Sequence, residues 1–180
     1  MRHIVIAAGL AVLAVPALAM PLHVPAPATA IVTPARAAAV STDTFVQTAA
    51  ISGMFEIQSS QLALQNAGDD QIKQFAQMMI ADHQKAADEL KAVAQQKNLQ
   101  LPQELDRRHA SILRRLEGRS GGAFDKTYAS AQLNGHRDAV RLFRSYARDG
   151  SDPEFKQWAQ TTLPMLEEHL RRAETIQDVE

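Results

Sequence analysis

The chain contains no cysteine among its 180 residues. This absence excludes disulfides, thiolate metal ligands, a cysteine nucleophile and a lipid-modified N-terminal cysteine. Any metal site must therefore be built from His, Asp, Glu, Met or backbone groups. The chain also lacks an excess of either charge, since the formal net charge is −1. No run of basic residues with interleaved aromatics is present, so we expect neither nucleic acid nor an anionic membrane surface as a partner.

Recognisable catalytic arrangements are absent as well. The sequence shows no Ser/His/Asp combination, no glycine-rich phosphate loop and no paired carboxylates that suggest a cleft. We therefore predict no catalytic residues. An enzyme that uses a metal-bound water or an oxidising metal is the least supported of the function classes considered below.

Long apolar runs occur only at the N-terminus. A charged start, Met1–His3, precedes the apolar stretch Ile4–Leu18 and the small-x-small sequence Ala17–Ala19. This pattern is typical of a secretory signal peptide over residues 1–19, and Ala37 offers a second cleavage position. The run is shorter than the ~20 residues that a membrane-spanning helix needs. We expect export to the periplasm without a transmembrane segment after cleavage. Association with the outer membrane is compatible with this location.

Residues 20–40 form a segment rich in proline and alanine. Its prolines are spaced too closely for a helix, so the segment is predicted to be a linker. Residues 41–180 then form one domain, as expected for a chain of this length.

The domain is predicted to be all-α. Apolar residues recur every three or four positions in five segments, each bounded by N-cap residues, Gly or Pro. The connection at Gly68 is very short, so the first two helices should be antiparallel neighbours. The predicted helices run from about Ser41 to Ala67, Asp69 to Asn98, Pro102 to Glu117, Ala123 to Arg148 and Asp152 to Gln177.

The first helix has an unusual inward face. Glu56 lies in a stripe of small residues that leaves room around its carboxylate, and the other members are Ala49, Gly53, Ser60 and Ala63. Alternatively, Glu56 lies at the edge of the apolar face and reaches solvent. A second stripe is expected to supply the ordinary packing, and it consists of Ala50, Met54, Ile57 and Leu64.

Three histidines occupy comparable places on the other long helices. His83 and His169 each take a position where a 3-4 repeat of apolar residues should continue, and His136 lies at the midpoint of its helix. At ~1.5 Å per residue, Glu56 lies ~18 Å before the first turn and His83 ~22 Å after it. His136 lies ~22 Å before the last turn and His169 ~27 Å after it. The four side chains can therefore meet in one layer of a bundle.

Three imidazoles and one carboxylate suit a single divalent transition metal such as Zn, Fe, Mn or Cu. We therefore predict His83, His136, His169 and Glu56 as metal ligands. Asp82 and Glu168 point about 100° away around their helices, so they are expected as supporting or surface residues. A buried His/Glu cluster that only fixes the register of the bundle is the alternative.

Several motifs along the domain resemble those of a known family. They are Glu56 with Leu62-Ala63, then Lys73, Phe75-Ala76, Met79 and Asp82-His83, then Phe124-Asp125, Tyr128 and His136, and finally Leu163-Pro164 and His169-Leu170. With them, the run from Phe45 to Ile176 resembles the bacterial domain-of-unknown-function 4142 family. The resemblance implies an exported protein with a ferritin-like four-helix bundle and a short connecting helix. Some members are labelled as outer-membrane proteins.

The predicted ligands differ from those of the di-iron proteins that share the ferritin fold. Di-iron members of that fold use Glu-x-x-His on two helices. Here Ile80 and Leu166 stand three residues before His83 and His169. We therefore expect one metal ion for sensing, buffering or stress protection, and no ferroxidase or iron-storage activity. The alternative is a non-catalytic envelope protein with a structural His/Glu cluster and a surface that binds another protein.

Overall fold

The structure, a computed structural model, describes residues 40–177. The predicted signal peptide and all but the last residue of the predicted linker lie outside the described residues. Within the described part, the fold is all-α and has no strand. The five helices are α1 (Thr42–Asn66), α2 (Asp70–Gln96), α3 (Arg107–Glu117), α4 (Gly121–Asp149) and α5 (Pro153–Gln177).

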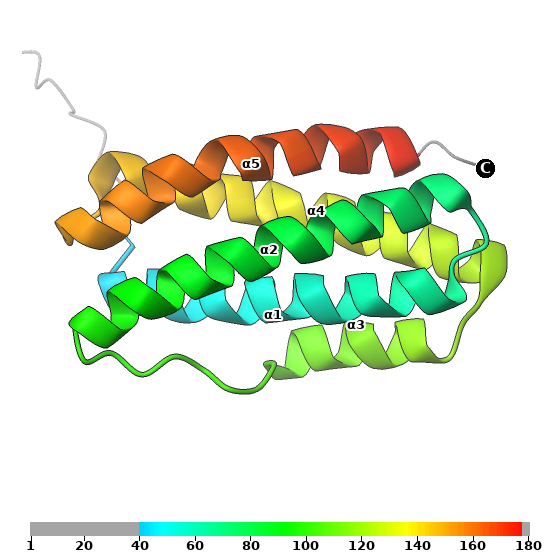
Figure 1. Ribbon diagram of the computed structural model, residues 1–180, viewed down its shortest axis with the longest axis horizontal. Helices are drawn as coiled ribbons and strands as arrows, with labels where there is room; N and C mark the ends of the chain where they lie inside the picture. The colour runs from blue at the N-terminus through cyan, green and yellow to red at the C-terminus, as the bar shows by residue number, and fades with distance from the viewer. Residues whose placement is uncertain (1–39, 178–180) are drawn as a thin grey trace, which may run out of the picture. The chain divides into compact units, whose positions relative to one another are not determined.

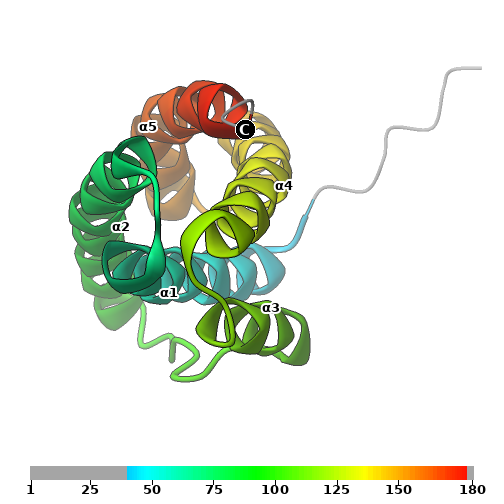
Figure 2. The same cartoon turned by 90° about the vertical axis from the view of Figure 1, so that its right-hand side faces the viewer.

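Helices α1, α2, α4 and α5 run alongside one another as a bundle (Figure 1). The view along the bundle shows these four helices around a common centre, with α3 outside them next to α1 and α4 (Figure 2). The predicted four-helix bundle with a short extra connecting helix is confirmed. None of the helices between residues 40 and 177 is both long and apolar enough to pass through a lipid bilayer.

Helix boundaries follow side-chain caps. The carboxylate of Asp69 accepts a hydrogen bond from the backbone N–H of Gln71 at 2.6 Å, which fixes the start of α2 directly after α1. The predicted start of α3 at Pro102 is wrong, because α3 begins five residues later. Asp106 caps this helix by accepting from the backbone N–H of His109 at 2.8 Å.

The core consists of two apolar clusters, one toward each end of the bundle. Each draws residues from all four long helices. The first cluster includes Phe45, Leu90, Val140 and Phe155, and the second includes Ala63, Ile72, Phe124 and Ala173. On every long helix a buried polar residue lies between the two clusters. These polar residues include Glu56, His83, His136 and His169.

The packing of α1 differs from the prediction. Ala50, Met54 and Ile57 are only half-buried, and Leu64 is 38% exposed, so this stripe is not the main packing face. Phe55 is buried instead. Helix α3 covers this side of α1, where the rings of Phe55 and His109 have centroids 5.2 Å apart. His109 is therefore half-buried, and it pairs with Asp106.

Candidate metal centre

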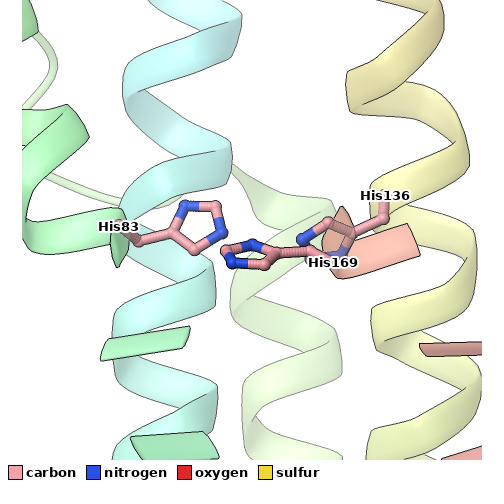
Figure 3. A group of neighbouring side chains, drawn as sticks. All are labelled: His83, His136 and His169. Carbon is pink, nitrogen blue, oxygen red and sulfur yellow. The ribbon is translucent and has the colours of Figure 1, made fainter. Parts of the chain in front are cut away.

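The structure brings the three predicted histidines together in the middle of the bundle. His83 comes from α2, His136 from α4 and His169 from α5, and their side chains point toward one another (Figure 3). One ring nitrogen of each lies within 4.8 Å of the corresponding nitrogens of the other two. Their side chains are almost fully buried, with exposed fractions of 6%, 1% and 1%. A single ion can therefore be reached by all three.

In two of these rings, a hydrogen bond to a neighbouring oxygen determines which ring nitrogen keeps its lone pair. His136 Nδ1 lies 2.9 Å from the backbone carbonyl oxygen of Gln132. A carbonyl only accepts hydrogen bonds, so Nδ1 donates and Nε2 carries the lone pair. His169 Nε2 lies 2.9 Å from Asp82 Oδ2, so this nitrogen donates to the carboxylate and Nδ1 carries the lone pair. Asp82 thus has the supporting place that a carboxylate often has behind a metal-binding histidine.

Each of the three rings has a buried nitrogen with no hydrogen-bond partner among the described residues. These nitrogens are His83 Nε2, His136 Nε2 and His169 Nδ1. A buried polar atom without a partner costs free energy, so such atoms usually have a hydrogen bond or a ligand. Metal–nitrogen bonds of about 2.1 Å in a tetrahedral site place the nitrogens roughly 3.4 Å apart.

The histidines are neutral at physiological pH. Burial, aided by the charge of His169, lowers the pKa of His136 from 6.5 to about 4. Burial and the charges of the other two histidines hold the pKa of His83 well below its usual range. Burial also lowers the pKa of His169, although the hydrogen bond to Asp82 opposes this effect. Neutral imidazole is the form that binds a metal ion.

Glu56 is buried next to the histidines but is not one of their close set of ligand atoms. Its exposed fraction is 4%, so the interpretation that it reaches solvent is wrong. Burial raises the pKa of its carboxyl from 4.5 to about 8, although a hydrogen bond with Gln132 opposes the shift. Glu56 Oε2 has no hydrogen-bond partner among residues 40–177. The residue is therefore a candidate ligand that must lose a proton and move to bind.

A cavity of about 390 Å³ adjoins two of the three histidines. Glu56, His83 and His136 line it together. Ala49 and Gly53, two members of the predicted stripe of small residues, also line this cavity. The small side chains of α1 thus leave the space beside Glu56 that the sequence predicted.

The sequence interpretation missed two residues that shape this centre. Gln132 holds His136 through its carbonyl oxygen, and its side-chain amide donates to Ser59 Oγ at 3.1 Å. Gly135 leaves room for Glu56, because a Cβ at this position would lie 2.9 Å from Glu56 Oε1. A glycine inside a long helix costs about 1 kcal/mol relative to alanine, and this cost was a signal that could have identified it.

Glu168, the other acidic neighbour of a cluster histidine, has a surface role. Its carboxylate accepts hydrogen bonds from Arg171 and Arg172 of the same helix. It therefore does not support the centre as Asp82 does.

Fold and site define the protein as an all-α bundle with a buried cluster of three histidines. The chain belongs to the family described as "Domain of unknown function (DUF4142)", which matches residues 26–176. The resemblance seen in the sequence motifs is thus confirmed. No curated protein matches the chain in sequence.

Two solved structures share the fold. The DUF305 fragment from Deinococcus radiodurans is 12% identical, with a TM-score of 0.65, and the match covers 74% of this chain and 92% of that one. CopM in the Cu(II)-bound form is 17% identical, with a TM-score of 0.66, and the match covers 78% of this chain and 97% of that one. At these identities the similarity extends to the fold alone.

Proposed function

We propose that this protein binds one divalent transition-metal ion in its bundle core, through His83 Nε2, His136 Nε2 and His169 Nδ1. One observation carries the proposal: one ring nitrogen of each histidine lies within 4.8 Å of those of the other two, and each ring also has a buried nitrogen without a hydrogen-bond partner. In His136 and His169 the other ring nitrogen donates a hydrogen bond, which leaves the lone pair of the proposed ligand nitrogen free to bind a metal ion. Glu56 or a water molecule would complete the coordination.

The donor set narrows the choice of metal. Three imidazole nitrogens suit Cu, Zn and Fe better than Mn, which prefers oxygen ligands. CopM, which shares the fold, is known in a Cu(II)-bound form. Copper and zinc are therefore the first ions to test. We place the protein in the periplasm on the strength of its signal-peptide pattern, with a role in metal sensing, buffering or stress protection.

A purely structural His/Glu cluster is the competing explanation. Such a network stabilises a core when its members bond to one another. Other buried polar residues near the centre do bond to one another, since the side-chain amide of Gln132 donates to Ser59 Oγ at 3.1 Å. His83 Nε2, His136 Nε2 and His169 Nδ1 lack such partners, which favours a bound ion.

Metal content tests the proposal directly. The mature chain, residues 20–180, is purified from the periplasm without a His-tag and measured by mass spectrometry. A His83→Ala, His136→Ala double variant removes two ligands, and His109→Ala is the matched control outside the centre. We expect about one equivalent of metal in the parent and the control, and none in the double variant. If the parent stays metal-free after incubation with Zn, Fe, Mn and Cu, the proposal is wrong and the cluster is structural.

A further inference from the structure

Charge is strongly segregated along the chain, although its total is close to zero. Residues 107–148, which span α3 and most of α4, contain ten Lys and Arg residues and three Asp and Glu residues, a net charge of +7. The rest of the chain carries −8. The overall charge of −1 therefore conceals a basic region. This region is spread over 42 residues, so it forms no run in the sequence.

The fold gathers part of this region into one groove. A cavity of about 960 Å³ is bounded by α3 and α4, with residues of α1 in its wall. Helix α3 lies beside α1 and α4 in the view along the bundle (Figure 2). We call this cavity the basic groove. Six basic side chains line it: Arg108, Arg115, Arg119, Lys126, Arg137 and Arg141.

Acidic side chains are few in the basic groove. Asp138 pairs with Arg141 and lies 3.5 Å from Arg108, so one carboxylate serves two guanidinium groups. The other acidic residue in the wall is Glu56, which is 4% exposed. Positive charge therefore exceeds negative charge by a wide margin in the part of the groove that solvent reaches. Like charges held close together repel one another, and a bound anion would relieve this repulsion.

Some of the basic groups are already held in place. Arg119 donates a hydrogen bond to Thr127 Oγ1 at 2.7 Å, and Arg137 has Glu174 Oε1 at 3.8 Å. Arg115 and Lys126 are exposed and form no ion pair with any residue of 40–177. These two side chains are therefore available to a ligand without breaking an existing pair.

The groove's chemistry suits phosphate groups. A guanidinium group presents a planar fork of donors that matches two oxygens of a phosphate. Thr48, Ser52 and Ser130 add hydroxyl groups to the wall. The aromatic rings of the wall are those of Phe55 and His109, which pack against each other. No other aromatic ring in the wall is available to stack on a nucleobase.

We infer that the basic groove binds a ligand carrying two or more closely spaced phosphate groups. Such groups occur in a soluble polyphosphate chain and in the headgroups of anionic lipids at a membrane surface. The inference depends on the charges of α3 and α4 and is independent of the metal proposal. The net charge of −1 led us to expect no anionic membrane surface as a partner. The inference differs because the local charge of the basic groove, and not the net charge of the chain, determines what the groove binds.

Two matched double variants test the inference. Arg115→Glu with Lys126→Glu reverses two charges in the groove. Arg114→Glu with Lys85→Glu changes the same residue types at exposed positions outside the groove. All proteins are freed of metal by a chelator and dialysed, and circular dichroism checks their folding. Inorganic tripolyphosphate is titrated by calorimetry at low and high salt, and phosphatidylglycerol vesicles are compared with phosphatidylcholine vesicles by co-sedimentation.

We expect the parent and the control to bind tripolyphosphate or the phosphatidylglycerol vesicles, and high salt to weaken this binding. The groove variant should bind at least about tenfold more weakly at low salt. The two arms distinguish a soluble ligand from a lipid surface. The inference is overturned if neither probe binds the parent, or if the two double variants lose affinity equally.

Discussion

Glu56 leads to a specific prediction about the stability of the metal-free protein. Its pKa is about 8 in the folded state, against 4.5 in a solvated carboxyl, because burial disfavours the charged form. The folded pKa is raised, so this contribution to stability is fully present below pH 4.5 and is lost as the pH rises to 8. One unit of pKa shift corresponds to about 1.4 kcal/mol, so the loss is on the order of 5 kcal/mol. This is a large part of a typical folding free energy of about 5–15 kcal/mol.

Glu56→Gln should remove this pH dependence, because an amide resembles the protonated carboxyl and does not titrate. The assay is urea denaturation of parent and variant in chelator at several pH values from 4.5 to 8. We expect the free energies of unfolding to be similar at pH 4.5 and the variant to become more stable by several kcal/mol at pH 8. Glu89→Gln, at an exposed position on α2, is the control and should show no such trend. A variant-minus-parent difference that does not change with pH would refute the reasoning.

Three further predictions concern the residues around the centre. The pKa of His136 falls from 6.5 to about 4, so this residue alone should contribute a loss of stability on the order of 3 kcal/mol as acid is added between these pH values; urea denaturation should show the free energies of unfolding of the parent and of His136→Gln diverging by this amount, and a difference that does not change with pH would contradict it. Asp82→Asn should weaken metal binding about 10- to 100-fold, measured by competition with a chromogenic chelator, because the supporting carboxylate is lost; equal affinity would count against its role. Gly53→Ala should raise the free energy of unfolding by about 1 kcal/mol, since a Cβ there meets nothing within 4 Å. Gly135→Ala should give no such gain in stability, because the new Cβ would be too close to Glu56 Oε1. Combining it with Glu56→Ala should restore the gain. An equal gain in Gly53→Ala and Gly135→Ala would show that the contact with Glu56 has no effect.

The helices and the polar layer could be predicted because both depend on local sequence. The 3-4 repeat gave the four long helices, and similar distances from a shared turn placed Glu56 at the depth of His83 and His136 at the depth of His169. The start of α3 was missed because Pro102 and Asp106 both suit a helix start, and the choice between them depends on contacts with α1. The burial of Phe55 was missed, and that of Glu56 was left open, for a related reason. Both side chains face elements that are distant in sequence, α3 for Phe55 and α4 for Glu56.

The basic groove was missed because the composition averages over the whole chain. Its six cations are separated by up to 33 positions, from Arg108 to Arg141, and acidic residues elsewhere compensate for them in the total. Only the packing of α3 against α1 and α4 brings them together. The same limit applies to Gln132, whose contact with Ser59 joins residues 73 positions apart.

The division of the core into two apolar clusters has a consequence for how the bundle opens. Each cluster contains residues of all four long helices, so each end of the bundle has its own hydrophobic interior. The layer between them, which includes His83 and His136, adds polar groups and little apolar burial. The two ends are therefore expected to act as separate cooperative units in native-state hydrogen exchange. Amides near Phe45 and Phe155 should exchange as one group, and those near Ile72 and Phe124 as another.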